Sequence, residues 1–355
     1  MAGRGAEFIG TMQVQEKHRF DVGRLESYLT SRIEGFRAPL VVEQFRGGQS
    51  NPTYRLTDAG GRRYVLRRKP PGKLLPSAHA VDREFRVISA LNRTDVPTPR
   101  AYVLCEDEAL IGTAFYVMEY CDGRVLWDPL LPDVPVAGRA AYYRSKVETL
   151  AKLHRVDPID VGLGDFGRPG SYVARQISRW GKQYKASETE RIPEMDQLLE
   201  WLPAHAPTSD ESTIVHGDFR FDNMIYHATE PRVLAIIDWE ISTLGDPMAE
   251  LSYLLMMYRI PKDQNGMAGQ DLVALGIPDE LQMRRWYAEL TGRTDTTYWE
   301  FYMAYNIFRV ACIRQGVYAR SLDGTASNRL AAESGKMVRP NAELAWSLVE
   351  RIAKS

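Results

Sequence analysis

Three side chains in the middle of the chain have the types and spacing of a phosphoryl-transfer site. Asp218 lies within the run 216–223 (HGDFRFDN), five residues before the amide of Asn223. A second carboxylate, Asp238, follows the apolar run 234–237, twenty residues after Asp218. Magnesium-dependent transfer of phosphate from ATP needs such a set, because one carboxylate must lie near the acceptor hydroxyl and hard oxygen atoms must bind the metal ion.

Each of the three residues can be given a role. Asp218 would accept or orient the proton of the substrate hydroxyl. Asn223 offers a neutral oxygen to Mg²⁺, and Asp238 would bridge the metal to the nucleotide phosphates. Ordinary turn chemistry is the alternative, since Asn and Asp favour the ends of strands. The combination of all three favours the transfer site.

The histidines do not suggest a metal-dependent hydrolase site. His216 is expected to fix the loop as a structural donor, and His154, at helical spacing with Val147 and Leu150, is expected to be a packed core residue. A metal-dependent hydrolase built on His216 and Asp218 would need further ligands. Six scattered histidines do not supply them.

Composition excludes several classes of protein. The chain has 355 residues, 44% of them hydrophobic, and a net charge of -1. This length predicts two lobes, and the charge argues against a nucleic-acid partner. No apolar run has membrane-spanning length. The three cysteines, Cys105, Cys121 and Cys312, are odd in number and far apart, which favours a reducing cytoplasm over a disulfide framework.

The pattern of elements changes near residue 123. Before it, strand-like runs dominate, with one helix over 81–91 that ends before a Pro-rich stretch. After it, the pattern is mostly helical, with short apolar runs around the motif. We expect an α+β architecture with a flexible N-terminus (1–20), a sheet-rich lobe (21–121), a connector near 118–123 and a larger helical lobe (124–355). The predicted strands are 41–46, 53–57, 63–67, 101–104, 114–120, 213–215, 223–226 and 233–237, and the later helices 138–156, 172–186, 194–203, 247–258, 279–291, 296–320 and 336–353.

A glycine pair lies between two of the strand-like runs. Gly48, Ser50 and Asn51 belong to the segment 47–51, where a tight turn could bring backbone amides and a hydroxyl against phosphates. An ordinary hairpin turn explains the segment equally well. The sequence contains neither a P-loop nor a dinucleotide fingerprint.

The motif and the order of elements resemble the aminoglycoside phosphotransferase and choline kinase group. The resemblance rests on His-Gly-Asp with Asn five residues after Asp, then Ile-Asp-Trp-Glu (237–240), and it extends from about residue 40 to 320. It implies a bilobal fold similar to that of protein kinases, with ATP and Mg²⁺ as cofactors. The sequences of residues 64–75 and of Gly-Asp-Pro at 245–247 are similar to those of one branch of the family, which also occurs as a kinase-like domain fused to acyl-CoA dehydrogenases.

The resemblance also implies roles in the first lobe. Kinase-like sites hold the phosphates with a cation on the third strand, paired with a glutamate on the following helix. The matching positions are Arg67 and Glu84, so arginine replaces the usual lysine. Arginine keeps the charge but differs in geometry. The backbone at Glu119, Tyr120 and Cys121 matches the stretch that reads the adenine edge in the family.

The acceptor is a small molecule with a hydroxyl group, and the sequence narrows it little further. Arginines could bind an anionic acceptor or form surface ion pairs. No dense acidic cluster suits a polycationic aminoglycoside, and the branch resemblance points to a hydroxyacyl-CoA-like metabolite. A pseudokinase that binds nucleotide without transfer is the alternative that Arg67 leaves open. The residues considered for the acceptor are Arg175, Arg179, Tyr305, Arg309 and Arg314.

Overall fold

The structure is a computed structural model, and it describes residues 9–47, 51–72, 79–208, 211–264, 266–323 and 331–354. The chain divides into two compact units. Unit 1 comprises Met1–Leu131, Val161–Leu163 and Phe221–Ser242, and unit 2 comprises Pro132–Asp160, Gly164–Arg220 and Thr243–Ser355. The connector expected at 118–123 falls within unit 1, and its action as a hinge stays a prediction.

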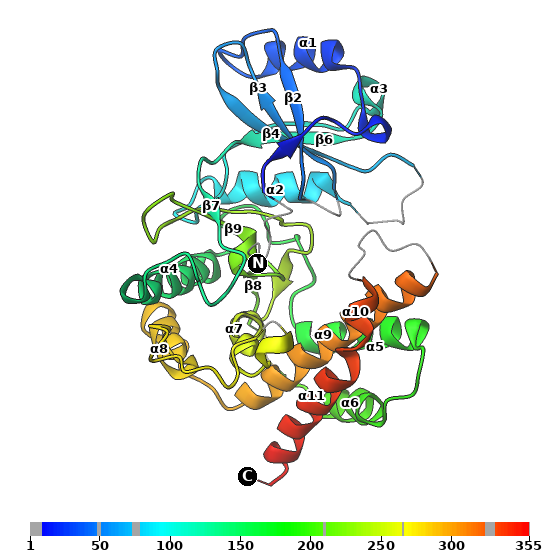
Figure 1. Cartoon of the computed structure of the whole chain (residues 1–355), viewed down its shortest axis with the longest axis vertical. Helices are drawn as coiled ribbons and strands as arrows, with labels where there is room; N and C mark the ends of the chain where they lie inside the picture. Colours follow the sequence, from blue (N-terminus) through cyan, green and yellow to red (C-terminus); the bar gives the residue numbers. More distant parts are fainter. Residues whose placement is uncertain are drawn as a thin grey trace. The chain divides into compact units, whose positions relative to one another are not determined.

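Unit 1 is built on an antiparallel sheet (Figure 1). In the described residues its order is β1-β2-β3-β4-β6-β5. Alternate side chains of the central strands, such as Tyr54, Leu56 and Leu66, are fully buried, as expected for strands with one face against a core. The strands are β1 (Thr11–Met12), β2 (Val41–Phe45), β3 (Thr53–Thr57), β4 (Arg63–Arg68), β5 (Ala101–Cys105) and β6 (Phe115–Glu119).

Short helices complete the core of unit 1. Helix α1 (Val22–Arg32) begins at Asp21, whose carboxylate accepts a hydrogen bond from the backbone N–H of Arg24 (3.0 Å), and it buries Leu25 and Leu29. Helix α2 (Val81–Leu91) contacts β5 and β6, and α3 (Glu108–Ile111) contacts α1. Of the N-terminal segment expected to be flexible, residues 1–8 lie outside the described residues. Residues 11–12 instead form β1, which pairs with β2, and a 3₁₀ helix (η2) follows at Glu16–His18.

A second sheet of unit 1 contains part of the motif. Its order is β10-β9-β7, formed by Val233–Ile236, Met224–Tyr226 and Arg124–Val125. A 3₁₀ helix, η3 (Phe221–Asn223), leads directly into β9. The hairpin β9–β10 therefore connects Asn223 to the residues just before Asp238.

Unit 2 is mainly helical. Strand β8 (Thr213–Val215) pairs with β11 (Thr243–Gly245), and the catalytic-type loop begins directly after β8. Helix α7 (Pro247–Leu255) starts at Asp246, whose Oδ1 accepts hydrogen bonds from the N–H groups of Met248 and Ala249 and so caps the helix. The other helices are α4 (Val136–Arg155), α5 (Tyr172–Ser187), α6 (Pro193–Ala204), α8 (Glu280–Thr291), α9 (Trp299–Leu322), α10 (Ala331–Gly335) and α11 (Val338–Ile352), with 3₁₀ turns η4 (Met256–Tyr258) and η5 (Lys262–Gln264).

Helix α9 is the central helix of unit 2. It packs against α5, α7, α10 and α11 (Figure 1, orange). Tyr305, Asn306 and Phe308 are among its fully or almost fully buried residues, so polar groups on this helix must find partners inside the protein. No helix in the described residues is both long enough and apolar enough to cross a membrane.

Candidate active site

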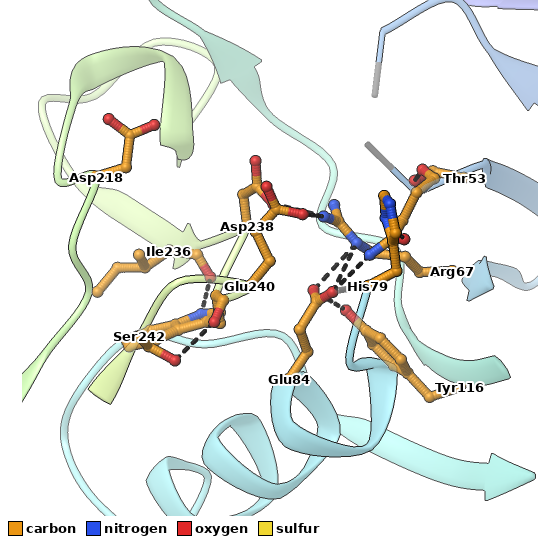
Figure 2. A network of polar contacts seen from close by, with 12 residues as sticks. Thr53, Arg67, His79, Glu84, Tyr116, Asp218, Ile236, Asp238, Glu240 and Ser242 are labelled. Atoms are coloured by element: carbon orange, nitrogen blue, oxygen red, sulfur yellow. Dashed lines mark hydrogen bonds and ion pairs between the residues drawn. The ribbon is translucent and has the colours of Figure 1, made fainter. Parts of the chain in front are cut away.

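Arg67 is the centre of the polar network in unit 1 (Figure 2). It lies on β4 and is 8% exposed. Its Nε atom lies 3.0 Å from Oε2 of Glu84, and its Nη2 atom lies 2.5 Å from Oδ1 of Asp238 and 3.5 Å from Oε2 of Glu240. One guanidinium thus contacts three carboxylates, which its planar fork of donors allows and a lysine ammonium would not do in the same geometry.

Glu84 is the buried partner of this arginine. It lies in the first turn of α2 and is fully buried. The Nδ2 atom of Asn51 donates to its Oε1 (2.9 Å) and the hydroxyl of Tyr116 donates to its Oε2 (3.1 Å). Burial raises the pKa of Glu84 to about 7, because desolvation outweighs the charge of Arg67, which two other carboxylates share.

The same contacts keep Arg67 charged. Burial acts to lower its pKa, but the negative charges of Glu84 and then Asp238 outweigh burial and hold the pKa above the usual range for arginine. The network therefore presents a fixed positive charge at Asp238. A fixed cation of this kind can bind phosphate oxygens through charge-assisted hydrogen bonds.

Asn51 supports this network from the end of the predicted phosphate turn. It is fully buried, and its Oδ1 lies 2.9 Å from Nδ1 of His79, while its Nδ2 donates to Glu84. Both ends of the amide are thus occupied by protein groups. Gly48 and Ser50, the other two residues predicted in this turn, lie outside the described residues.

The hairpin β9–β10 brings Asn223 and Asp238 to the same end of the sheet. Strand pairing places Ile236 opposite Met224, and the N–H of Ile237 donates to the carbonyl of Asn223 (2.9 Å). Asp238, the next residue, has a φ of 67°, in the left-handed region that Asp tolerates better than most residues. This turn directs the Asp238 carboxylate to Arg67 (Figure 2).

The residues after Asp238 hold the turn in place. The indole N–H of Trp239 donates to the carbonyl of Ile236 (3.0 Å), and the Ser242 hydroxyl donates to the Trp239 carbonyl (2.6 Å). Trp239 is 1% exposed. Trp239 therefore anchors the turn in the core.

The donor set of Asn223 and Asp238 fits a magnesium ion. Both offer hard oxygen atoms, and Mg²⁺ typically binds one or two carboxylates and takes its remaining ligands from water and substrate phosphates. In the described residues no three His, Cys, Asp or Glu side chains are grouped in a way that could hold a metal by themselves.

The end of β6 has a backbone available for a ligand. Glu119 is tied down, because its N–H donates to the Arg100 carbonyl (2.8 Å) and its Oε2 accepts from the Arg100 N–H (3.1 Å). In the described part of the chain, neither Tyr120 nor Cys121 forms a hydrogen bond to another backbone group outside the sheet ladder, which ends at Glu119. The Tyr120 ring stacks on Phe45 at 6.5 Å. Recognition of the adenine edge by the backbone of residues 119–121 stays a prediction.

Asp218 lies in unit 2, on the loop after β8. The hydroxyl of Tyr253 donates to its Oδ1 (2.5 Å), and Arg220 contacts it through Nε (2.8 Å to Oδ1) and Nη2 (3.2 Å to Oδ2). Burial acts to raise the pKa of Asp218, but the charge of Arg220 and the hydrogen bond from Tyr253 outweigh burial and lower it. Asp218 is therefore an ionised carboxylate at neutral pH, ready to accept a proton.

The backbone of this loop is held from two sides. Oε2 of Glu250 accepts from the N–H of His216 (3.0 Å), and Oε1 accepts from the N–H of Gly217 (2.5 Å). Nη2 of Arg309 donates to the carbonyl of Gly217 (2.7 Å). Gly217 has a φ of 86°, which glycine adopts without strain. Because the peptide groups that precede Asp218 are bonded to buried charged side chains, α7 and α9 fix the loop that leads into Asp218.

The histidines of unit 2 stabilise this loop and its surroundings. The ring of His216 accepts, rather than donates, a hydrogen bond at Nδ1, from the N–H of Asp218 (3.2 Å). His154 is 2% exposed and contacts Glu250 (3.0 Å) and the hydroxyl of Tyr287 (2.7 Å), which confirms its expected place in the core.

Two residues of the site were not predicted from the sequence. Glu250 and Tyr253 were treated as part of an ordinary buried helix, yet they hold the loop and the carboxylate of Asp218. The signal in the sequence is Glu250, a charged residue within the otherwise apolar helix 247–255. A carboxylate is rarely buried without a partner, so its position predicts a buried polar contact.

The arginines considered for an anionic acceptor mostly have structural partners. Arg309 bonds the Gly217 carbonyl, Arg314 donates to Oδ1 of Asn341 (2.8 Å), and Arg175 donates to two backbone carbonyls in the loop before α5. Arg309 alone among these three contacts the loop that carries Asp218. A role of these arginines in binding an anionic acceptor stays a prediction.

Known proteins resemble this chain over most of its length. Residues 41–290 match the phosphotransferase enzyme family. Acyl-CoA dehydrogenase family member 10 of Mus musculus is 46% identical over 333 residues, which cover 92% of this chain and 31% of that protein, so the chain spans less than a third of this relative's length.

Solved structures show the same fold. A protein of Ralstonia eutropha, solved as a candidate aminoglycoside phosphotransferase, is 50% identical, covers 94% of this chain and 99% of its own, and has a TM-score of 0.87. Two more distant structures share the fold. An aminoglycoside phosphotransferase in ternary complex with AMP-PNP and hygromycin B is 16% identical, with 91% of this chain and 98% of that chain covered and a TM-score of 0.58. Choline kinase of Cryptosporidium parvum is 13% identical, with 93% of this chain and 97% of that chain covered and a TM-score of 0.60. The bilobal α+β fold is thereby confirmed, and the chain belongs to the phosphotransferase enzyme family.

Proposed function

We propose that this protein is a small-molecule kinase that transfers the terminal phosphate of ATP to a hydroxyl group. The observation that carries the proposal is the ion pair of Arg67 with buried Glu84, extended to Asp238. Arg67 is a buried cation that pairs with a fully buried carboxylate, Glu84, and with Asp238, whose side chain is 35% exposed. This arrangement is suited to a phosphate and its counter-ion. The neighbour solved with AMP-PNP supports ATP as the donor.

The residues of unit 1 would bind the nucleotide. The backbone at Glu119, Tyr120 and Cys121 would read the adenine edge, and Arg67 would bond phosphate oxygens with the donors that now contact Asp238 and Glu240. Asn223 and Asp238 would hold Mg²⁺. When bound, the ion supplies positive charge that offsets the charge developing on the phosphate oxygens.

Asp218 would serve the acceptor. Its ionised carboxylate orients the acceptor hydroxyl and takes its proton while the hydroxyl oxygen bonds to the phosphorus and the bond to the ADP oxygen breaks. Tyr253 and Arg220 hold the carboxylate in one orientation for this step. The relative named as an acyl-CoA dehydrogenase family member supports a hydroxyacyl-CoA-like acceptor over an aminoglycoside.

The test is a product analysis. The protein is incubated with ATP and Mg²⁺ and a pool of hydroxyacyl-CoAs, choline-like amines and aminoglycosides, and the pool is analysed by mass spectrometry for added phosphate. A phosphorylated hydroxyacyl-CoA supports the whole proposal, and another phosphorylated compound supports the kinase but changes the acceptor. Tight Mg²⁺-dependent nucleotide binding with no product would favour a pseudokinase, the role that arginine at position 67 leaves open.

A further inference from the structure

Three buried polar atoms on one face of α9 have no hydrogen-bond partner among the residues that the structure describes. They are the hydroxyl of Tyr305, Oδ1 of Asn306 and Nε of Arg309, and within the described residues none of them forms a hydrogen bond. Their residues are 1%, 0% and 6% exposed. Buried groups of this kind usually have partners, and leaving them unpaired costs free energy. Three in one place therefore need an explanation.

The three residues line one small cavity. It is lined by Tyr305, Asn306 and Arg309 together with Gly217, Glu250 and the ring of Tyr253. Positions 305 and 309 are one helical turn apart and 306 is adjacent, so the three side chains reach the cavity from the same side of α9. The cavity thus lies between α9 and the loop that carries Asp218.

Existing hydrogen bonds fix how each group points. Nδ2 of Asn306 donates to the carbonyl of Ala249 (2.9 Å) and to Oγ of Ser252 (2.7 Å), so the other end of the amide must be the acceptor Oδ1. Nη2 of Arg309 is held by the Gly217 carbonyl. Burial raises the pKa of Tyr305, so its hydroxyl keeps its proton. The cavity therefore offers two donors and one acceptor.

Size and charge decide what can occupy it. The cavity has a volume of about 10 Å³, which is close to the minimum for one water molecule and too small for a substrate group. Glu250 opposes a bound anion, and Arg309 opposes a bound cation. A neutral molecule with both donor and acceptor capacity remains.

We propose that this cavity binds one structural water molecule. The water accepts hydrogen bonds from Nε of Arg309 and from the hydroxyl of Tyr305, and it donates one to Oδ1 of Asn306. Three hydrogen bonds are typical of a buried water. The water gives Nε of Arg309 a partner, while Nη2 of the same guanidinium bonds the Gly217 carbonyl beside Asp218. The proposal does not depend on phosphate transfer.

A high-resolution crystal structure of the whole chain tests the proposal directly. The expected result is one density peak within hydrogen-bond distance of the three named atoms, refining as water. An empty cavity, a bound ion, or side chains rotated to pair with each other would overturn it.

Thermal unfolding of the Tyr305→Phe variant gives a second test, because a hydroxyl that bonds the water and a hydroxyl that has no partner predict opposite changes in the melting temperature. If the hydroxyl bonds the water, its removal lowers the melting temperature. If it has no partner, its removal takes away an unsatisfied buried group and raises the melting temperature. Tyr184→Phe is the matched reference, because its buried hydroxyl also has no partner in the described chain but does not line this cavity. A Tyr305→Phe protein as stable as or more stable than Tyr184→Phe contradicts the proposal.

Discussion

The hydroxyl of Tyr253 donates a 2.5 Å hydrogen bond to Oδ1 of Asp218. Tyr253 lies on α7, and the guanidinium of Arg309 from α9 lies 4.8 Å from its ring centroid. The same Arg309 bonds the carbonyl of Gly217. The base proposed for the reaction is therefore positioned by two helices that are distant in sequence, through a tyrosine and an arginine that also contact each other.

Tyr253→Phe should shift the pH dependence of turnover. The hydrogen bond from Tyr253 helps to lower the pKa of Asp218, so its loss raises that pKa. Asp218 then stays protonated to a higher pH, and the acidic limb of the kcat/KM profile moves to higher pH. We also expect a loss of activity of about 10- to 100-fold at neutral pH, because the carboxylate is less well positioned.

Tyr302→Phe is the control for this experiment. Tyr302 donates to Oδ2 of Asp246 at 2.7 Å, so the substitution also removes a tyrosine–aspartate hydrogen bond from unit 2. It should leave the acidic limb unmoved. Equal shifts in the two variants would show that Tyr253 acts on general stability and not on Asp218.

Arg67→Lys should weaken nucleotide binding. Lysine keeps the charge, but a single ammonium cannot contact Glu84, Asp238 and a phosphate in the geometry that the guanidinium permits. We expect the KM for ATP to rise about tenfold, equivalent to about 1.4 kcal/mol. Arg55→Lys, at an arginine of β3 paired with Glu43, is the matched control and should leave the KM unchanged. An unchanged KM in Arg67→Lys would remove Arg67 from the phosphate site.

Asp238→Asn should raise the Mg²⁺ concentration needed for nucleotide binding. The amide keeps an oxygen but loses the charge that attracts the metal and that now pairs with Arg67. Isothermal titration with AMP-PNP over a series of Mg²⁺ concentrations measures the effect. Glu240→Gln removes the more distant carboxylate, at 3.5 Å from Arg67, and is expected to have the smaller effect. The reverse order would assign the metal to Glu240.

Glu250→Gln should destabilise unit 2 and alter its acid sensitivity. Glu250 is buried and accepts from two backbone N–H groups and His154, so breaking this network should cost about 3–5 kcal/mol. These contacts outweigh burial, which acts to raise its pKa, and hold the pKa below the usual value. A lowered folded-state pKa stabilises the protein above the unfolded pKa, about 4.3, and that contribution is lost as the pH falls through the folded value.

Urea unfolding between neutral and acidic pH measures both effects. The wild type should lose stability below about pH 4.3, and Glu250→Gln should lose less over the same range because its contribution is already absent. Glu300→Gln is the control, since Glu300 pairs with Arg259 at a partly exposed site and should change stability little. Similar effects in the two variants would contradict the role given to Glu250.

Local patterns predicted most of the elements and their order. Helix 81–91 and the strands at 53–57 and 213–215 form with those bounds, because each has a clear apolar period or a run of strand-forming residues. The prediction of a single helix before residue 123 was wrong, because α1 (Val22–Arg32) and α3 (Glu108–Ile111) also form there. Strands β1 (Thr11–Met12), β7 (Arg124–Val125) and β11 (Thr243–Gly245) were missed. They are two or three residues long, and they exist because a partner strand pairs with them and not because of their own sequence.

The site was predictable only where its residues share a short motif. Asp218, Asn223 and Asp238 could be named from spacing, and the resemblance added Arg67 and Glu84. Their supports could not be found this way. Asn51 and Glu84 are 33 residues apart, and Asp218 and Tyr253 are 35 apart, so no local pattern relates them. Only the fold brings these partners together.

The most direct test of the proposed function compares Asp218→Asn with the wild type and with Asp222→Asn, a nearby aspartate that has no assigned role. ATP-dependent phosphorylation of the acceptor and Mg²⁺-dependent binding of AMP-PNP are measured on all three proteins. We predict that Asp218→Asn loses turnover by about 10²- to 10⁴-fold while its nucleotide affinity and that of Asp222→Asn stay close to the wild type. Full turnover in Asp218→Asn would contradict the assignment of Asp218 as the base.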